Sequence, residues 1–177
     1  MVEYLQLGYL WLVQFVWRAL PMLVTMTLLL MSCAPLNLFG DAIPAPDLAL
    51  LSIYFWAMHG PSFLPPWAVF VIGAAQDLVS GTPLGFWIVL YLFVYGFTLS
   101  QRVFFKGRTG IGVWLGFALV AAINASTAWV LGMLLLERYV NPAELILQGF
   151  VSIALYPWLA RLLMTVRRSL TNAPESL

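Results

Sequence analysis

The chain has 177 residues, 63% of them apolar and only 8% charged, and its formal net charge at pH 7 is +1. Soluble domains carry about 25% charged residues, so this composition indicates an integral membrane protein with almost no aqueous domain, and the small net charge gives no footprint for nucleic acid. A single cysteine, Cys33, excludes an internal disulfide, and a single histidine, His59, with a few scattered acids argues against enzymatic metal chemistry.

Residues 1–18 are expected to form an interfacial or lead-in helix. The segment is mostly apolar and aromatic, and its Trp and Tyr side chains would anchor it at the depth of the lipid headgroups. The first membrane span is expected to follow from about Leu20 to Leu38, opened by Pro21. The polar side chains of the first segment fall on one narrow stripe, formed by Glu3, Gln6, Gln14 and Arg18.

A loop rich in Gly and Pro, residues 39–47, precedes the second span, Leu48 to His59. We place Asp47 in the first turn of this span, where the helix dipole favours a negative charge. His59-Gly60-Pro61 is a helix-stop signal, and we interpret His59 as a helix-end residue at the membrane interface. Because this span is short for a full crossing, a re-entrant hairpin around residues 59–66 is the alternative.

Residues 73–85, with the sequence Gly-Ala-Ala-Gln-Asp-Leu-Val-Ser-Gly-Thr-Pro-Leu-Gly, organise the rest of the chain. They join the third span, opened by Pro65-Pro66, to the fourth, Pro83 to Ser100. Evenly spaced glycines surround one carboxylate, Asp77, in otherwise apolar sequence. A buried acid is costly inside a membrane, so Asp77 needs a partner or a water-filled recess. The glycines are Gly73, Gly81 and Gly85.

The turn between the third and fourth spans has its own local signals. Pro83 disfavours helix at Thr82, so the third span should end near Ser80 with Gly81 as its left-handed cap. Thr82 then suits the N-cap of the fourth span, with Pro83 as the first helical residue. We therefore predict a tight helix–turn–helix unit.

Two roles for Asp77 follow from this turn. In the first, its carboxylate ties the two helices together by accepting hydrogen bonds from the backbone N–H groups of Leu84 and Gly85. In the second, it faces a cavity or a partner within the membrane, as buried acids often do. The sequence alone leaves both roles open.

The fifth span is expected from Gly110 to Leu136, which is long enough to cross with tilt. Gly112 and Gly116 form a small-xxx-small pair, which favours close and lipid-facing helix packing. Asn124 lies in the middle of this span and must hydrogen-bond to another helix or to water. Four alanines extend the thin face, namely Ala118, Ala121, Ala122 and Ala125.

The sixth span is expected from about Ala143 to Met164, and Pro157 inside it should kink the helix and free the carbonyl four residues earlier. Basic clusters at 102–108 and 161–168 are separated by two spans, so they share one face, which the positive-inside rule makes cytoplasmic. With about six spans of ~20 residues, both termini are cytoplasmic. The predicted parts are the lead-in helix 1–18, a six-span domain 19–168 and a short cytoplasmic tail 169–177.

The chain resembles MreD, a polytopic inner-membrane component of the bacterial rod-shape machinery. The resemblance covers most of the chain and is densest over residues 46–85, while the length, the span count and the short basic tail also match. Gln76 departs from the pattern, because an apolar residue is expected before the Asp, and the N-terminal aromatic helix is longer than expected. The motifs are Pro46-Asp47 and Gly73-x-x-x-Asp77-x-x-x-Gly81-x-Pro83-x-Gly85.

The resemblance implies a non-enzymatic scaffold or regulator of the cell-elongation complex, without a cofactor. Its implied partners are an MreC-like bitopic membrane protein, the MreB cytoskeleton and membrane lipids. The RodA polymerase and its penicillin-binding transpeptidase would be contacted directly or through MreC. By analogy the all-α fold is similar to the six-helix substrate-binding subunits of energy-coupling-factor transporters. The predicted structural or interaction residues are Asp47, Gly73, Asp77, Gly81, Pro83, Gly85, Gly112, Gly116 and Asn124.

Two other functions compete with this interpretation. A small-molecule-binding subunit of a transporter would use Asp77, Asn124 and Gln148 as polar contacts, because Gly/Pro-interrupted segments often line such sites. An intramembrane enzyme would need paired catalytic groups or a metal. The predicted topology places His59 and Asp77 at opposite membrane depths, so we expect no enzymatic activity.

Overall fold

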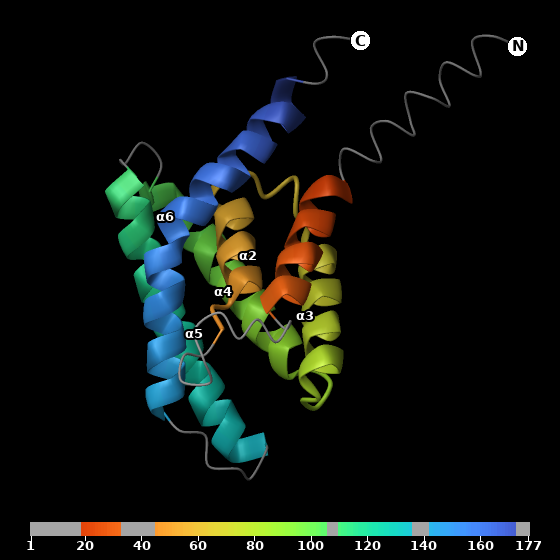
Figure 1. Cartoon of the computed structure of the whole chain (residues 1–177), viewed down its shortest axis with the longest axis vertical. Coiled ribbons are helices and arrows are strands. Elements are labelled where there is room, and N and C mark those ends of the chain that lie inside the picture. The colour runs from red at the N-terminus through yellow and green to blue at the C-terminus, as the bar shows by residue number, and fades with distance from the viewer. Residues whose placement is uncertain (1–18, 33–44, 106–109, 136–141, 173–177) are drawn as a thin grey trace, which may run out of the picture.

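The computed structural model describes residues 19–32, 45–105, 110–135 and 142–172, and all regular structure in these ranges is α-helical (Figure 1). This confirms the all-α class for the described part of the chain. The predicted helix over residues 1–18 and the cysteine at position 33 lie outside it. The helices are Ala19–Ser32, α2 (Leu48–His59), α3 (Pro66–Ser80), α4 (Phe86–Phe105), α5 (Gly110–Leu135) and α6 (Pro142–Asn172).

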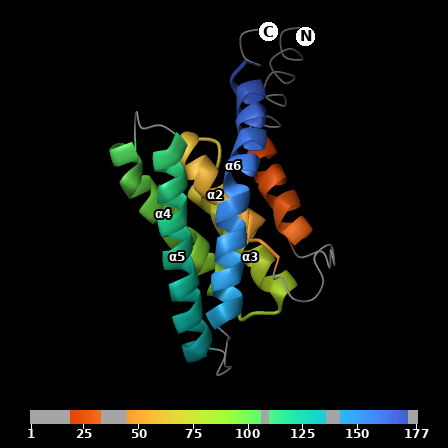
Figure 2. The same cartoon turned by 60° about the vertical axis from the view of Figure 1, so that its left-hand side comes forward.

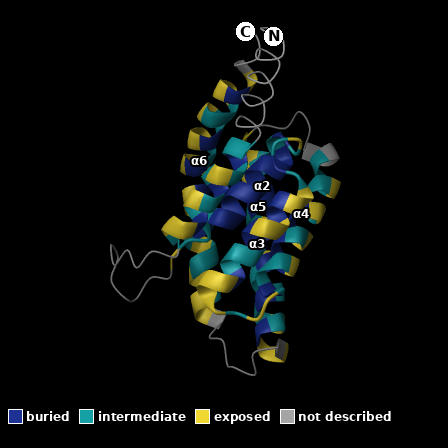
Figure 3. Cartoon of the chain, turned by 90° about the vertical axis from the view of Figure 1, so that its right-hand side faces the viewer, coloured by how far each residue is buried: buried dark blue, intermediate teal, exposed yellow. Residues whose placement is uncertain are grey.

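The centre of the bundle is α2, whose residues 49–58 are all buried. Figure 3 shows the buried positions concentrated on this helix, and α2 packs against both α4 and α6. A helix that is apolar on every side is expected to be enclosed by other elements. The helix α2 is therefore short, as the sequence indicated, but it is enclosed by other helices and does not face lipid.

Two helices are long and apolar enough to cross a membrane by length and composition, Gly110–Leu134 within α5 and Ala143–Thr171 within α6. They lie side by side (Figures 1 and 2) and pack against each other. The helix α6 continues through Asn172, beyond the predicted end of the sixth span at Met164. No helix-stop signal such as Gly or Pro occurs between these two positions.

Pro157 lies inside α6, as predicted. Proline has no N–H group, so the carbonyl of Ile153 loses its intrahelical donor. The indole Nε1 of Trp114 in α5 donates a hydrogen bond to this carbonyl at 2.9 Å. The freed acceptor is thereby used to join α5 to α6.

The helices run in alternating directions, so their ends gather at two levels (Figure 1). The His59 end of α2, the Phe105 end of α4 and the Asn172 end of α6 lie at one end of the bundle, with Ala19. We call this the basic end, because Arg102, Arg161 and Arg167 lie toward it. The opposite end carries the described acids, Asp47, Asp77 and Glu144, and we call it the acidic end.

Candidate functional site

Asp77 in α3 is almost completely buried, with 1% of its surface exposed, and both carboxylate oxygens are hydrogen-bonded. Oδ2 accepts from the backbone N–H of Gly85 at 2.8 Å. Oδ1 accepts from the backbone N–H of Trp87 at 2.8 Å and from the hydroxyl of Thr82 at 2.9 Å. The carboxylate thus binds N–H groups at the start of α4, as in the first of its two predicted roles, but the donors are Gly85 and Trp87 rather than Leu84 and Gly85.

The turn itself differs in one respect from the prediction. Gly81 is left-handed at φ 65°, as expected for the cap of α3. Helix α4, however, begins at Phe86 rather than at Pro83, so Thr82 is not its N-cap. Gly85 has a φ of 111°, which lies outside the helical region and is a conformation that glycine adopts readily. The helix therefore begins only after Gly85. Asp77, from the preceding helix, takes the capping role.

Gly73 permits α3 and α4 to approach closely. A Cβ atom at this position would lie 2.6 Å from the Cα of Ile88 and 3.0 Å from its backbone nitrogen. These are backbone atoms, which cannot move aside without shifting α4. The α3–turn–α4 unit, which we call the hairpin, is therefore fixed at the turn by Asp77 and along the helices by Gly73.

Asp47 lies at the N-cap of α2 and joins three helices. Its Oδ1 accepts from the backbone N–H of Leu50 at 2.9 Å and from the hydroxyl of Tyr91 in α4 at 3.2 Å. Its own N–H donates to the hydroxyl of Ser152 in α6 at 3.1 Å. The predicted stabilisation by the start of α2 is present, with Asp47 one residue before the helix.

Asn124 is 6% exposed, and its Oδ1 has no hydrogen-bond partner among the described residues. With Asp47, Gln148 and Ser152 it lines a cavity of about 30 Å³, which is the size needed for water. Asp77 does not line this cavity. The three polar contacts suggested for a transporter subunit therefore do not converge on one site.

The pair Gly112 and Gly116 does not form a lipid-facing surface, because Gly116 is buried and Gly112 is half-buried. Gly116 lies on the inner side of α5, beside the buried Phe117, whose ring stacks on that of Tyr156 at 4.7 Å. The expectation that this pair is exposed was wrong. Periodicity alone did not show which face of α5 turns toward the bundle.

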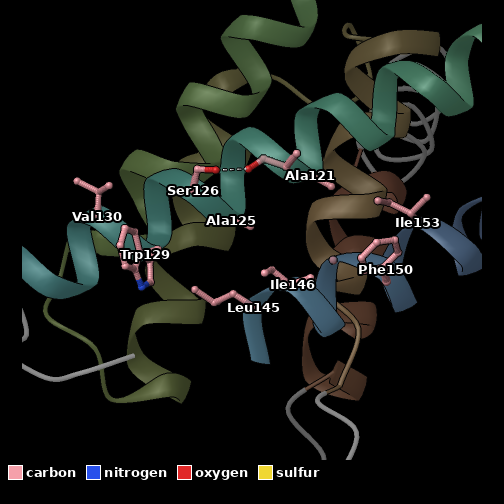
Figure 4. A pocket seen from close by; sticks show the side chains of 11 residues that line it. Ala121, Ala125, Ser126, Trp129, Val130, Leu145, Ile146, Phe150 and Ile153 are labelled. Atoms are coloured by element: carbon pink, nitrogen blue, oxygen red, sulfur yellow. Dashed lines mark hydrogen bonds between the residues drawn. The ribbon is translucent and has the colours of Figure 1, made fainter. Parts of the chain in front are cut away.

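An exposed groove of about 500 Å³ instead runs between α5 and α6 (Figure 4). Small residues form much of its wall, and the predicted thin face of alanines contributes Ala122 and Ala125. The indole Nε1 of Trp129 is buried in it without a hydrogen-bond partner among the described residues. We call this the α5–α6 groove; it is lined by Ala121, Ala122, Ala125, Ser126, Trp129, Val130, Leu145, Ile146, Gly149, Phe150 and Ile153.

Gly149 and Trp129, which line this groove, were not predicted from the sequence. The alanine spacing on α5 was the available signal, but nothing in the sequence identified α6 as the opposite wall. Among the described residues, no group of three or more His, Cys, Asp or Glu side chains could hold a metal ion. The groove offers apolar contact, close backbone approach and the hydroxyl of Ser126, which itself donates to the carbonyl of Ala122.

Comparison with known proteins gives one match. The model of a protein family described as rod shape-determining protein MreD matches residues 12–166. This range includes the described helices from Ala19–Ser32 to α5 and most of α6. No curated protein and no solved structure matches the chain.

Proposed function

The chain belongs to the MreD family of rod shape-determining membrane proteins, and on this premise we propose that it is a non-enzymatic scaffold of the bacterial cell-elongation complex. In this role it helps to place or regulate lateral peptidoglycan synthesis. The single observation that carries the proposal is the family match over residues 12–166, which includes the hairpin and both walls of the α5–α6 groove.

We propose a six-span arrangement in the inner membrane with both termini in the cytoplasm. The direction of the helices supports it, because the Ala19 and Asn172 ends lie at the same end of the bundle (Figure 1). Arg102 and Arg167 share that end, and an excess of basic residues is typical of the cytoplasmic side. The acidic end would then face the periplasm.

The α5–α6 groove is the proposed docking surface for the single membrane helix of an MreC-like partner. Small residues such as Ala122, Ala125 and Gly149 let a second helix approach closely, which is how helices associate in lipid. MreB, RodA and the transpeptidase would be reached through this partner or directly.

In this proposal the hairpin residues have a structural role and do not contact the partner. Asp77, Gly73, Gly81 and Gly85 fix α3 against α4, and Pro83 limits the turn between them. The outer side of the hairpin exposes large apolar side chains at a fixed geometry, with Leu84 the most exposed at 74%. Asp47 has the corresponding role for α2, α4 and α6.

A transporter subunit is less well supported. The cavity around Asn124 has about 30 Å³, whereas small-molecule sites have roughly 300–1,000 Å³. The similarity to energy-coupling-factor subunits remains a prediction, since no solved structure matches the chain.

The test replaces Gly149 by Leu in the full-length protein. A Cβ atom at Gly149 would meet no heavy atom within 4 Å, so a larger side chain can begin there and extend into the groove that Gly149 lines. We expect recovery of the MreC-like partner to fall at least about fivefold, the equivalent of roughly 1 kcal/mol of binding free energy, and cells to lose their rod shape. A photocrosslinking residue at Ala122 should capture the same partner in native membranes.

The matched control is Gly96→Leu on the exposed side of α4, where space is also open. It should leave both partner recovery and cell shape unchanged. If Gly149→Leu protein folds and retains both, the groove is not the docking surface. If cells that lack the protein altogether remain rod-shaped, the proposed function itself is wrong.

A further inference from the structure

A second cavity, of about 440 Å³, lies between α2, α5 and α6 toward the basic end. It shares no lining residue with the α5–α6 groove. Its walls are mainly apolar and aromatic, and its polar lining groups come from His59, Tyr156 and Arg161. We call it the basic-end cavity; the other lining residues are Phe55, Gly110, Val113, Trp114, Pro157, Ala160 and Met164.

The surroundings of this cavity are cationic. Arg161 lines it and has no acidic partner among the described residues. Arg102 and Arg167 act electrostatically on His59, which lines the same cavity. The Nε atom of Arg167 is buried without a hydrogen-bond partner in the described part of the chain. Cations gathered beside an apolar bundle without a compensating acid favour a bound anion.

Two further groups suit an anion at this position. The hydroxyl of Tyr156 is buried, with 4% of the residue exposed, and has no hydrogen-bond partner within the described ranges. Helix α5 begins at Gly110 in the cavity wall, and the first N–H groups of a helix are free to bind anions. His59 is held beside them, because its Nδ1 lies 3.1 Å from the carbonyl oxygen of Phe55 and its ring stacks on that of Phe55.

We infer that the basic-end cavity binds the phosphate group of an anionic membrane lipid, with Arg161 as its principal contact. A guanidinium group matches phosphate oxygens through paired hydrogen bonds. Basic pockets between membrane helices on the cytoplasmic side commonly hold such headgroups. The apolar wall formed by Val113, Trp114 and Met164 accommodates an acyl chain, which a free phosphate ion does not have.

The experiment is a native mass spectrometry titration of the full-length protein in a non-ionic detergent. The probes are dioleoylphosphatidylglycerol, which is anionic, and dioleoylphosphatidylcholine, which has the same chains and a zwitterionic headgroup. We expect the anionic lipid to bind at least about tenfold more tightly, and Arg161→Gln to remove most of that difference. Inorganic phosphate at millimolar concentration should not displace the lipid.

Arg168→Gln is the matched control, because Arg168 is exposed on the same helix and does not line the cavity. It should change the affinity less than about twofold, because Arg168, although exposed like Arg161, does not line the cavity. Ala160→Phe, which fills the cavity and keeps every charge, should weaken binding of the anionic lipid as Arg161→Gln does. This second variant separates a cavity site from general surface attraction.

Four results would overturn the inference. Equal affinity for the two lipids would exclude recognition of the anionic headgroup. Equal losses for Arg161→Gln and Arg168→Gln, or no loss for Ala160→Phe, would indicate non-specific attraction to the basic end. Displacement of the lipid by inorganic phosphate would assign the site to the free ion. None of these results depends on whether the α5–α6 groove binds a partner helix.

Discussion

The two ends of the bundle handle their charged groups in opposite ways. At the acidic end, Asp77 accepts three hydrogen bonds from the turn after α3 and the start of α4, and Asp47 caps α2 while contacting α4 and α6. At the basic end, Arg161 has no acidic partner and the Nε of Arg167 has no acceptor among the described residues. Asp47 and Asp77 are therefore used to build the fold, whereas Arg161 is paired with no acid in the described part of the chain.

The largest expected effect is at Asp77. Asp77→Ala removes the acceptor of two part-buried N–H groups and one hydroxyl, and a donor left unsatisfied inside a protein costs about 1–3 kcal/mol. We expect the free energy of unfolding to fall by about 3 kcal/mol or more, measured by denaturant unfolding in detergent micelles. Asp77→Asn, which keeps one acceptor oxygen, should lose less.

Leu78→Ala provides the control for this change, because Leu78 is the neighbouring residue and is 73% exposed. It should alter the free energy of unfolding by less than about 0.5 kcal/mol. If Asp77→Ala were no more destabilising than Leu78→Ala, the carboxylate would not be needed for the fold. The contrast between the two ends would then have to be abandoned.

A smaller loss is expected at Gly73, which tests the close contact along the hairpin. Gly73→Ala forces a Cβ atom against the backbone of Ile88, and such overpacking typically costs about 1–3 kcal/mol. Gly96→Ala, with open space around it in α4, should instead stabilise by up to about 1 kcal/mol, because alanine favours helix. If both variants shifted the thermal unfolding temperature in the same direction, the close contact between Gly73 and Ile88 would be contradicted.

Much of the hairpin could be predicted from its sequence, because its signals are local. Gly81 as the left-handed cap follows from the proline two residues later, and a buried Asp near a helix start needs N–H donors. The donors were predicted only in part: Leu84 and Gly85 were expected, whereas the observed donors are Gly85 and Trp87. The reach of Asp77 depends on where α4 begins, and the positive φ of Gly85 sets that point.

The groove and the basic-end cavity could not be predicted, because they depend on how helices distant in sequence pack together. Gly116 was expected to face lipid and is buried, whereas Gly149 lines the groove. Likewise, Arg161 was identified only as part of a topological charge cluster. Its position beside His59 and Tyr156 follows from the packing of α6 against α2.

The smallest expected effect lies at the basic end, where the Trp114–Ile153 hydrogen bond joins α5 to α6. Trp114→Phe should lower the free energy of unfolding by about 1 kcal/mol, the usual net value of one hydrogen bond. Trp158→Phe is the control, since Trp158 lies on α6 and is 78% exposed, and it should have little effect. Both free energies would be measured by the same denaturant unfolding.

Pro157 leaves the Ile153 carbonyl without a donor in α6, so a double mutant of Pro157 and Trp114 tests the hydrogen bond more directly. In Pro157→Ala protein the Ile153 carbonyl regains an N–H donor within α6, so Trp114 is no longer its necessary partner. The cost of Trp114→Phe should therefore shrink in the Pro157→Ala background, with a coupling energy of about 0.5–1 kcal/mol between the two changes. Strictly additive effects would mean that the freed carbonyl contributes nothing to helix association. If Trp114→Phe lowered the free energy of unfolding as much as Asp77→Ala, polar contacts would stabilise the fold at both ends of the bundle. The contrast between the two ends would then not hold.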